Sequence, residues 1–221
     1  MAASVIAVGN LKGGAGKTTL AVNIASALAA HGDVDLVDAD AQATAQAWGE
    51  AGNLPAKVTV HAMPLAAETQ AGIRSWIAKL VALKTDAAFV VIDLPPNLGA
   101  TTTAALTLAD LFVVPVPPSG MDVRATNAAI ALLRQARQVR GGDKPACLLV
   151  PSRVDRRTAA GKEIEAVLSD FREPVAPAVI QRAAHVDAFS AGQWIGDYAP
   201  RSAGHTEIEA VAAVARRMVS R

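Results

Sequence analysis

The 221-residue chain has little cysteine, few aromatic side chains and no long apolar run. Its single cysteine, Cys147, excludes an internal disulfide and a metal site held by several cysteines of one chain. No run of about 18 apolar residues is present, so we expect no membrane span. The first residues also lack the basic and apolar pattern of a signal peptide, and we therefore expect a cytoplasmic protein.

The aromatic share is 4% whereas hydrophobic residues make up 52%, so the core must consist mainly of Ala, Val, Leu and Ile. A chain of this length predicts one well-buried domain, residues 1–221. The net charge is +1, but residues 120–221 hold 15 Lys and Arg against 11 Asp and Glu. This arginine-rich second half is compatible with an anionic partner and equally with a solvated surface.

Short apolar runs alternate with segments of helical periodicity along the chain. The expected strands are 4–9, 34–40, 88–96, 111–119 and 145–152. The expected helices are 18–32, 68–83, 99–109, 121–139, 159–169 and 205–219. This alternation predicts an α/β fold in which a mostly parallel sheet lies between two layers of helices. Functional groups of such a sheet gather where its strands end, which here means 10–19, 38–42, 93–97 and 115–120.

The stretch NLKGGAGKTTL, residues 10–20, joins the first expected strand to the first expected helix. Its glycines allow backbone N–H groups to point at one anion, and the helix N-terminus adds its dipole. Lys17 is expected to reach the β- and γ-phosphates of a nucleotide, and Thr18 to ligate Mg²⁺. The expected nucleotide contacts are Gly13, Gly14, Ala15, Gly16, Lys17, Thr18 and Thr19. The general pattern G-x-x-x-x-G-K-[ST] has glycine where this chain has Leu11.

Several segments resemble the ParA/MinD family of deviant Walker A P-loop ATPases. KGGAGKTT is similar to the deviant Walker A motif, which carries an extra lysine, here Lys12. VDLVDADAQATAQAW resembles the second strand and switch I, AFVVIDLPP the Walker B segment and switch II, and PVPPSGMDVRAT a later stretch of small ParA proteins. SRVDRRTAAGKEI and QRAAHVDAFSAG look like small ParA proteins of the ParF type. The resemblance implies a three-layer P-loop NTPase that uses ATP, ADP and Mg²⁺, without the N-terminal helix-turn-helix domain of larger ParA proteins.

The resemblance also implies roles for individual residues. In the family, two ATP-bound subunits pack face to face, and the extra lysine, Lys12, reaches the nucleotide of the partner. The match assigns Asp40 to positioning the attacking water and Asp38 to the Mg²⁺ shell. The proline that usually follows the second aspartate is Ala41 in this chain, although Gln42 keeps its place.

Asp93 closes the apolar strand FVVID, and the two prolines that follow argue against an immediate helix. A carboxylate there, facing Thr18, can hold Mg²⁺ directly or through water. Asn97 and Gly99 fall in the expected moving switch. The candidates for contacting adenine are Pro117, Ser152 and Arg153. The expected site is therefore Lys12, Lys17 and Asp40 for catalysis, and Thr18, Asp38 and Asp93 for the metal.

Among the functions of this family, the sequence favours a ParA-type partition or positioning ATPase. Its ATP-bound dimer would bind DNA non-specifically on the nucleoid, and a ParB-like or other adaptor would stimulate hydrolysis. The arginines available to contact phosphates without reading bases are Arg153, Arg156, Arg157, Arg182, Arg201, Arg216 and Arg217. A plasmid, a chromosome or a protein complex would each serve as cargo, and the sequence does not distinguish them.

Three other functions agree less well with the sequence. A MinD-like membrane ATPase, the main alternative, requires a terminal amphipathic helix with bulky apolar residues, whereas the tail EIEAVAAVARRMVSR is typical of a packing helix. An electron-transfer reductase resembling nitrogenase iron protein requires two cysteines per subunit, and this chain has one. A small-molecule kinase or ligase of the same fold does not ordinarily need Lys12.

Overall fold

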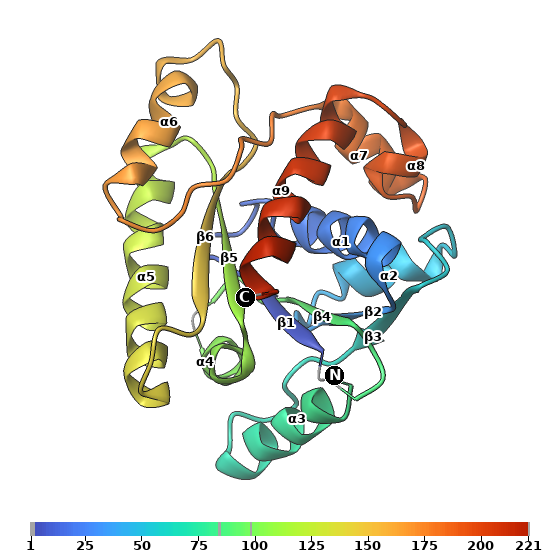
Figure 1. Ribbon diagram of the computed structural model, residues 1–221, viewed down its shortest axis with the longest axis vertical. Coiled ribbons are helices and arrows are strands. Elements are labelled where there is room, and N and C mark those ends of the chain that lie inside the picture. The colour runs from blue at the N-terminus through green and yellow to red at the C-terminus, as the bar shows by residue number, and fades with distance from the viewer. Residues whose placement is uncertain (1–2, 84, 98, 221) are drawn as a thin grey trace.

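The computed structural model describes residues 3–83, 85–97 and 99–220, which contain one six-stranded sheet (Figure 1). The strands are β1 (Ser4–Val8), β2 (Val34–Asp38), β3 (Val58–Ala62), β4 (Phe89–Asp93), β5 (Leu111–Val116) and β6 (Ala146–Pro151). Their order across the sheet is β3-β2-β4-β1-β5-β6, and every neighbouring pair is parallel. The predicted α/β fold with a parallel sheet is thus confirmed.

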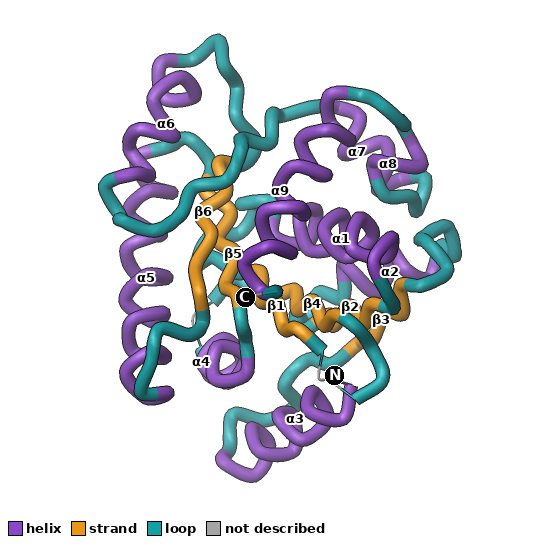
Figure 2. The backbone as a smooth tube through the Cα atoms, in the orientation of Figure 1, coloured by secondary structure: helices purple, strands orange, loops and turns teal. Residues whose placement is uncertain are grey.

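Helices connect the strands and cover both faces of the sheet (Figure 2). They are α1 (Lys17–Leu28), continued by the 3₁₀ turn η1 (Ala29–His31), α2 (Thr44–Glu50), α3 (Gln70–Leu83), α4 (Ala100–Leu108), α5 (Gly120–Arg140), α6 (Ala159–Ser169), α7 (Ala183–Ser190), α8 (Ile195–Tyr198) and α9 (Ala203–Val219). The six predicted helices all occur. The sequence did not predict α2, β3, α7 or α8, because these elements are too short to show a clear period and are stabilised by contacts with distant residues.

Alternate residues of the strands point to opposite faces and build two apolar layers. In β1, Ile6 and Val8 pack on the face covered by α1 and α9, whereas Val5 and Ala7 pack on the other face. The first layer also includes residues of α2, α7 and α8, and the second includes residues of α3, α4, α5 and α6. Helices therefore bury both faces of the sheet, which is why its strands are almost entirely apolar.

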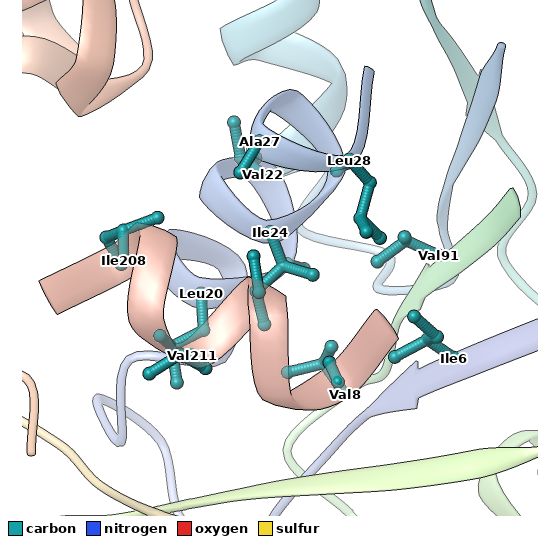
Figure 3. Packing of buried hydrophobic residues seen from close by; sticks show 14 of the residues in the cluster. Ile6, Val8, Leu20, Val22, Ile24, Ala27, Leu28, Val91, Ile208 and Val211 are labelled. Atoms are coloured by element: carbon teal, nitrogen blue, oxygen red, sulfur yellow. The ribbon is translucent and has the colours of Figure 1, made fainter. Parts of the chain in front are cut away.

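Helix α9 packs along α1 (Figure 3). Ile208, Val211 and Ala215 are fully buried in the layer that contains α1, and Met218 packs against the edge of that layer. The predicted apolar stripe of α9 is therefore a packing surface inside the molecule and not a face available to a bilayer. Within the described residues, no helix is both long enough and apolar enough to cross a membrane.

Ile208→Ala tests the packing of α9 on α1. The substitution would leave a cavity between the two helices, so we expect the free energy of unfolding to fall by about 2–5 kcal/mol. Urea unfolding measures this loss. Val139→Ala on α5 is the control, because Val139 is 75% exposed and its truncation should cost less than about 0.5 kcal/mol. Equally small losses in the two variants would contradict this packing.

Candidate functional site

The loop from Gly9 to Gly16 joins β1 to α1 and therefore lies where the strands of the sheet end. Gly14 and Gly16 have φ values of 75° and 90°, in the left-handed region where a side chain would strain the backbone. Leu11 is not among the described residues with positive φ, and its side chain is 41% exposed. Position 11 therefore does not require glycine, which explains how the loop departs from the general phosphate-loop pattern.

On the side of β5, the loop is held by Asn10, a buried polar residue. The Asn10 side-chain amide donates to the carbonyl of Pro115 at 2.7 Å, and its oxygen accepts from the backbone N–H of Leu11 at 2.7 Å. No motif in the sequence pointed to Asn10. Its role follows only from the tertiary structure, where a buried amide must find hydrogen-bond partners.

On the side of β6, two consecutive residues hold the same loop. The Ser152 hydroxyl donates to the carbonyl of Ala15 at 2.8 Å, and the Arg153 guanidinium donates to the carbonyl of Gly14 at 2.6 Å. Both residues also line the cleft described below, and their contact with adenine stays a prediction. Their hydrogen bonds add a second role, because they fix the loop from a strand more than a hundred residues away along the chain.

Lys17, the first residue of α1, is almost completely buried. Its ammonium group donates to the carbonyl of Lys12 at 3.2 Å. Burial lowers the pKa of Lys17, and the nearby carboxylates of Asp93 and Asp40 oppose this shift. Lys12 is partly exposed, so the two lysines of the loop occupy different environments. A phosphate group bound in the loop would supply Lys17 with the negative charge that its burial requires.

Asp93 and Asp38 end neighbouring strands and lie opposite each other in the register of β2 and β4. Both are almost completely buried, and adjacent parallel strands place such a pair on the same face about 5 Å apart at the backbone. Neither oxygen of Asp93 has a hydrogen bond of ordinary geometry. Burial raises the pKa of Asp93 to about 7. The hydrogen bond from the Thr18 hydroxyl and the charge of Lys17 lower this pKa, whereas the charge of Asp38 raises it.

Asp38 differs from Asp93 because both of its oxygens accept backbone N–H groups. Oδ1 accepts from Asp40 at 3.1 Å, and Oδ2 accepts from Gln46 in α2 at 2.9 Å. Burial raises the pKa of Asp38, and these N–H groups lower it. Asp38 therefore fixes the segment between β2 and α2. The oxygens of Asp38 already accept hydrogen bonds, whereas those of Asp93 are available for a metal ion. The role of Asp38 in the metal shell therefore stays a prediction.

Asp40 follows β2 and lines the cleft together with Lys17 and Thr18. Its Oδ1 accepts the backbone N–H of Gln42 at 3.0 Å, and its carbonyl accepts the N–H of Ala43 at 3.0 Å. These bonds order the turn even though it lacks the proline that is usual in the family. The carboxylate stands beside the phosphate loop, where a water-orienting group is expected, and that role stays a prediction.

The residues present fit a Mg²⁺ ion that is held together with a nucleotide. Asp93 offers two buried oxygens that need partners, and the Thr18 hydroxyl lies beside them. In the described part of the chain, no group of three or more His, Cys, Asp or Glu side chains is arranged to hold a metal. Mg²⁺ commonly takes only one or two protein ligands and completes its shell with phosphate oxygens and water. The donor set therefore matches nucleotide-bound magnesium better than a metal held by protein alone.

A cleft of about 700 Å³ begins at the phosphate loop. Its near end holds the loop, and its far end is formed by residues 179–183, His185, Val186 and Phe189. Trp48 of α2 also lines the cleft and contacts the Phe189 ring edge-to-face, with centroids 5.0 Å apart. A volume of this size accommodates a nucleotide. The sequence did not predict the far end, and Pro117 is not among the described residues that line the cleft.

The seven arginines predicted to contact DNA differ in their surroundings. Four have intramolecular hydrogen-bond partners: Arg153, Arg156, Arg157 and Arg182. The other three are Arg201 and Arg217, which are exposed, and Arg216, which is partly buried. The structure therefore distinguishes among them, and DNA contact stays a prediction for each.

The family profile described as "CobQ/CobB/MinD/ParA nucleotide binding domain" matches residues 6–193. The chain belongs to this family. It is a nucleotide-binding ATPase of the ParA/MinD type, and ParA-family ATPases use ATP and Mg²⁺. The phosphate loop and Thr18 line the cleft described above, and their contacts with ATP and Mg²⁺ stay predictions.

Relatives of this ATPase include proteins named for two cargoes. The chain is 32% identical over 183 residues to the maintenance of carboxysome distribution protein A of Halothiobacillus neapolitanus, covering 82% of this chain and 81% of that protein. It is 33% identical over 226 residues to the chromosome-partitioning ATPase Soj of Thermus thermophilus, covering 90% of each. Apo McdA of Cyanothece has the same fold, with a TM-score of 0.81 at 16% identity over 96% of this chain and 99% of that one.

Asp93→Asn tests the environment of the buried carboxylate in the nucleotide-free protein. Because the pKa of Asp93 is raised to about 7, folding takes up a proton between its unfolded and folded pKa values, and stability falls as pH rises through this range. The uncharged variant lacks this loss. From about pH 5 to pH 8, we expect its free energy of unfolding to gain about 3 kcal/mol relative to wild type.

Urea unfolding at the two pH values measures this difference. Titrating groups that do not interact with Asp93 are present in both proteins, so their effects largely cancel in the comparison. A constant difference between variant and wild type across the pH range would show that Asp93 ionises normally when buried.

Proposed function

We propose that this ATPase is a ParA-type motor that forms a dimer on ATP and positions or partitions a large cargo. The observation that carries the proposal is the division between two lysines of one loop. Lys17 is buried beside Asp93, whereas Lys12 is partly exposed next to the exposed side chain of Leu11. A loop that bound only its own nucleotide would need only the buried lysine. An exposed apolar and basic pair beside the site is what a nucleotide-dependent subunit contact requires.

In this proposal, the protein contributes mainly positioning and charge. The backbone N–H groups of residues 13–19 and the Lys17 ammonium bind the phosphates, and Lys12 adds positive charge to the nucleotide of the partner subunit. Asp40, whose backbone turn is held by Asp38 and by its own hydrogen bond to Gln42, orients the attacking water. Magnesium, when bound through Thr18 and Asp93, neutralises charge that develops on the phosphates. Asp40, which is partly exposed, would thus orient water, and the buried Asp93 would hold the metal.

We also propose that the protein is cytoplasmic and that its ATP-bound dimer associates with the nucleoid through non-specific DNA contacts. Arg201 and Arg217 support it best, because both residues are exposed, whereas the exposed Arg157 is paired with Asp155 at 2.8 Å. Arg201 precedes α9 and Arg217 lies in its last turn, so they would contact phosphates about 20 Å apart. A ParB-like or other adaptor would then stimulate hydrolysis and release the dimer.

Two features support this function over the alternatives. The apolar stripe of α9 is buried against α1, which removes the main reason to consider a MinD-like membrane helix. The relatives named above act, by their names, in carboxysome distribution and chromosome partitioning. We therefore propose that the cargo is a chromosome, a plasmid or a large protein assembly. The single ATPase domain of residues 1–221 would position it.

Lys12→Ala and Asp40→Ala test the two proposed roles in one experiment. With ATP and Mg²⁺ present, we expect Lys12→Ala to stay monomeric while keeping nucleotide affinity. Asp40→Ala should instead accumulate as a dimer, because it binds ATP but loses more than about tenfold in turnover. Light scattering and phosphate release measure both. An ATP-dependent dimer of Lys12→Ala would refute the role across the interface, and normal turnover by Asp40→Ala would refute the role in positioning water.

The DNA contact is tested by titrating random-sequence duplex with ATP-bound protein at about 50 mM and about 200 mM salt. We expect binding that requires ATP and weakens by more than tenfold at the higher salt, because phosphate contacts release counterions. Arg217→Ala should weaken binding and reduce the salt dependence. Arg134→Ala, an exposed arginine of α5, is the matched control and should bind like wild type. Absence of binding at low salt would contradict the DNA part of the proposal.

A further inference from the structure

The C-terminal helix α9 contacts the far end of the nucleotide cleft through one carboxylate. Glu207 Oε2 accepts the backbone N–H of Ile180 at 3.0 Å, and its Oε1 accepts from Arg182 Nη2 at 2.6 Å. The Arg182–Glu207 ion pair is partly exposed, with 34% of the arginine side chain and 18% of the glutamate side chain accessible to solvent. One carboxylate therefore joins the backbone of Ile180 to the side chain of Arg182.

The residues that Glu207 holds belong to the wall segment, residues 179–182, all of which line the cleft. The wall segment is extended and hydrogen-bonded along one side to the end of β6, where Val179 donates to Pro151 at 2.8 Å and Gln181 donates to Val154 at 3.0 Å. The N–H of Ile180 points to the opposite side, towards α9, where Glu207 accepts it. The wall segment is thus fixed between a strand and a helix that are far apart in the sequence.

Helix α9 is itself firmly attached to the helix that carries the phosphate loop. Ile208, next to Glu207, is fully buried with Val211 against Leu20 and Ile24 of α1 (Figure 3). The same helix pair therefore anchors both ends of the cleft. The phosphate loop leads into the first turn of α1, and the wall segment is tied to the second turn of α9.

A second basic side chain, His185, lies near the Arg182–Glu207 pair. His185 packs beside Arg182 below the start of α9, where an added Cβ at Gly204 would lie 3.4 Å from Arg182 Cδ and 3.5 Å from His185 Nε2. Burial lowers the pKa of His185, Glu207 raises it and Arg182 lowers it. The cation that pairs with Glu207 is Arg182, whose Nη2 lies 2.6 Å from Glu207 Oε1.

We infer that Glu207 and Arg182 are positioning residues that set the wall of the cleft against which the nucleoside part of ATP binds. Arg182 is then occupied inside the molecule and does not serve as a DNA contact. The inference rests on the proposed function, since it requires that the cleft binds ATP. It goes beyond that function because it assigns two residues, on α9 and before α7, that no phosphate-loop motif includes.

The test compares the affinity of the protein for ATP with its affinity for inorganic tripolyphosphate, which lacks the nucleoside, by calorimetry with Mg²⁺. Glu207→Ala should weaken ATP binding about tenfold or more and leave tripolyphosphate binding unchanged. Glu207→Gln, which keeps an acceptor for Ile180 but loses the charge, should weaken ATP binding by about threefold and is the variant that decides if the alanine variant does not fold. Glu209→Ala, an exposed glutamate on the same helix, is the control and should bind both ligands like wild type.

The outcomes separate this inference from the function on which it rests. Wild-type affinity for ATP in both Glu207 variants would overturn the inference and leave the proposed ATPase intact. Equal losses for ATP and tripolyphosphate would also overturn it, because they would indicate a general structural role. A wild-type protein that binds tripolyphosphate and ATP equally would show that the wall does not contact the nucleoside, and one that binds neither would refute the proposed function itself.

Discussion

Parallel pairing of β4 with β1 on one side and with β2 on the other brings three chain segments to one place, and the rest of the site depends on this pairing. The phosphate loop follows β1, Asp38 ends β2 and Asp93 ends β4. In a parallel sheet these ends are at the same edge, and equal register places the two carboxylates side by side on the face covered by α1. A shift of one residue in either strand would turn its aspartate to the opposite face.

The two neighbouring aspartates are equally buried at this edge, but they differ in their hydrogen bonds. Asp38 has backbone N–H groups to accept, so it organises the turn that carries Asp40. Asp93 accepts none among the described residues, and burial raises its pKa to about 7 in spite of the opposing effects of the Thr18 hydroxyl and Lys17. Such a group is stabilised when a cation arrives, which links magnesium and nucleotide binding to the stability of the fold. Lys17 has the opposite need, for an anion, in the same small volume.

The local part of the site could be predicted from the sequence, because its signals are local. Glycines 14 and 16 adopt the left-handed conformation that a phosphate loop requires, and Lys17 opens a helix whose apolar periodicity is clear. The far wall of the cleft could not be predicted, because it forms from Trp48, residues 179–182 and Phe189, which are brought together only by tertiary packing. The side chains that hold the loop were missed or assigned another role for the same reason. Asn10 contacts β5, and Ser152 and Arg153, which follow β6, contact the loop.

The alternation of strands and helices, the phosphate loop with its two lysines and the acidic residues at the strand ends could all be read from the amino-acid sequence. This is possible because backbone conformation, apolar periodicity and the chemistry of short motifs depend on residues close together in the chain. Other properties follow from the tertiary structure alone: which carboxylate accepts no backbone N–H, which arginines are already paired, and how Glu207 of α9 contacts the wall of the cleft. Those properties depend on burial and on distances between residues as far apart as Asn10 and Pro115, or Ala15 and Ser152, and no local pattern records them.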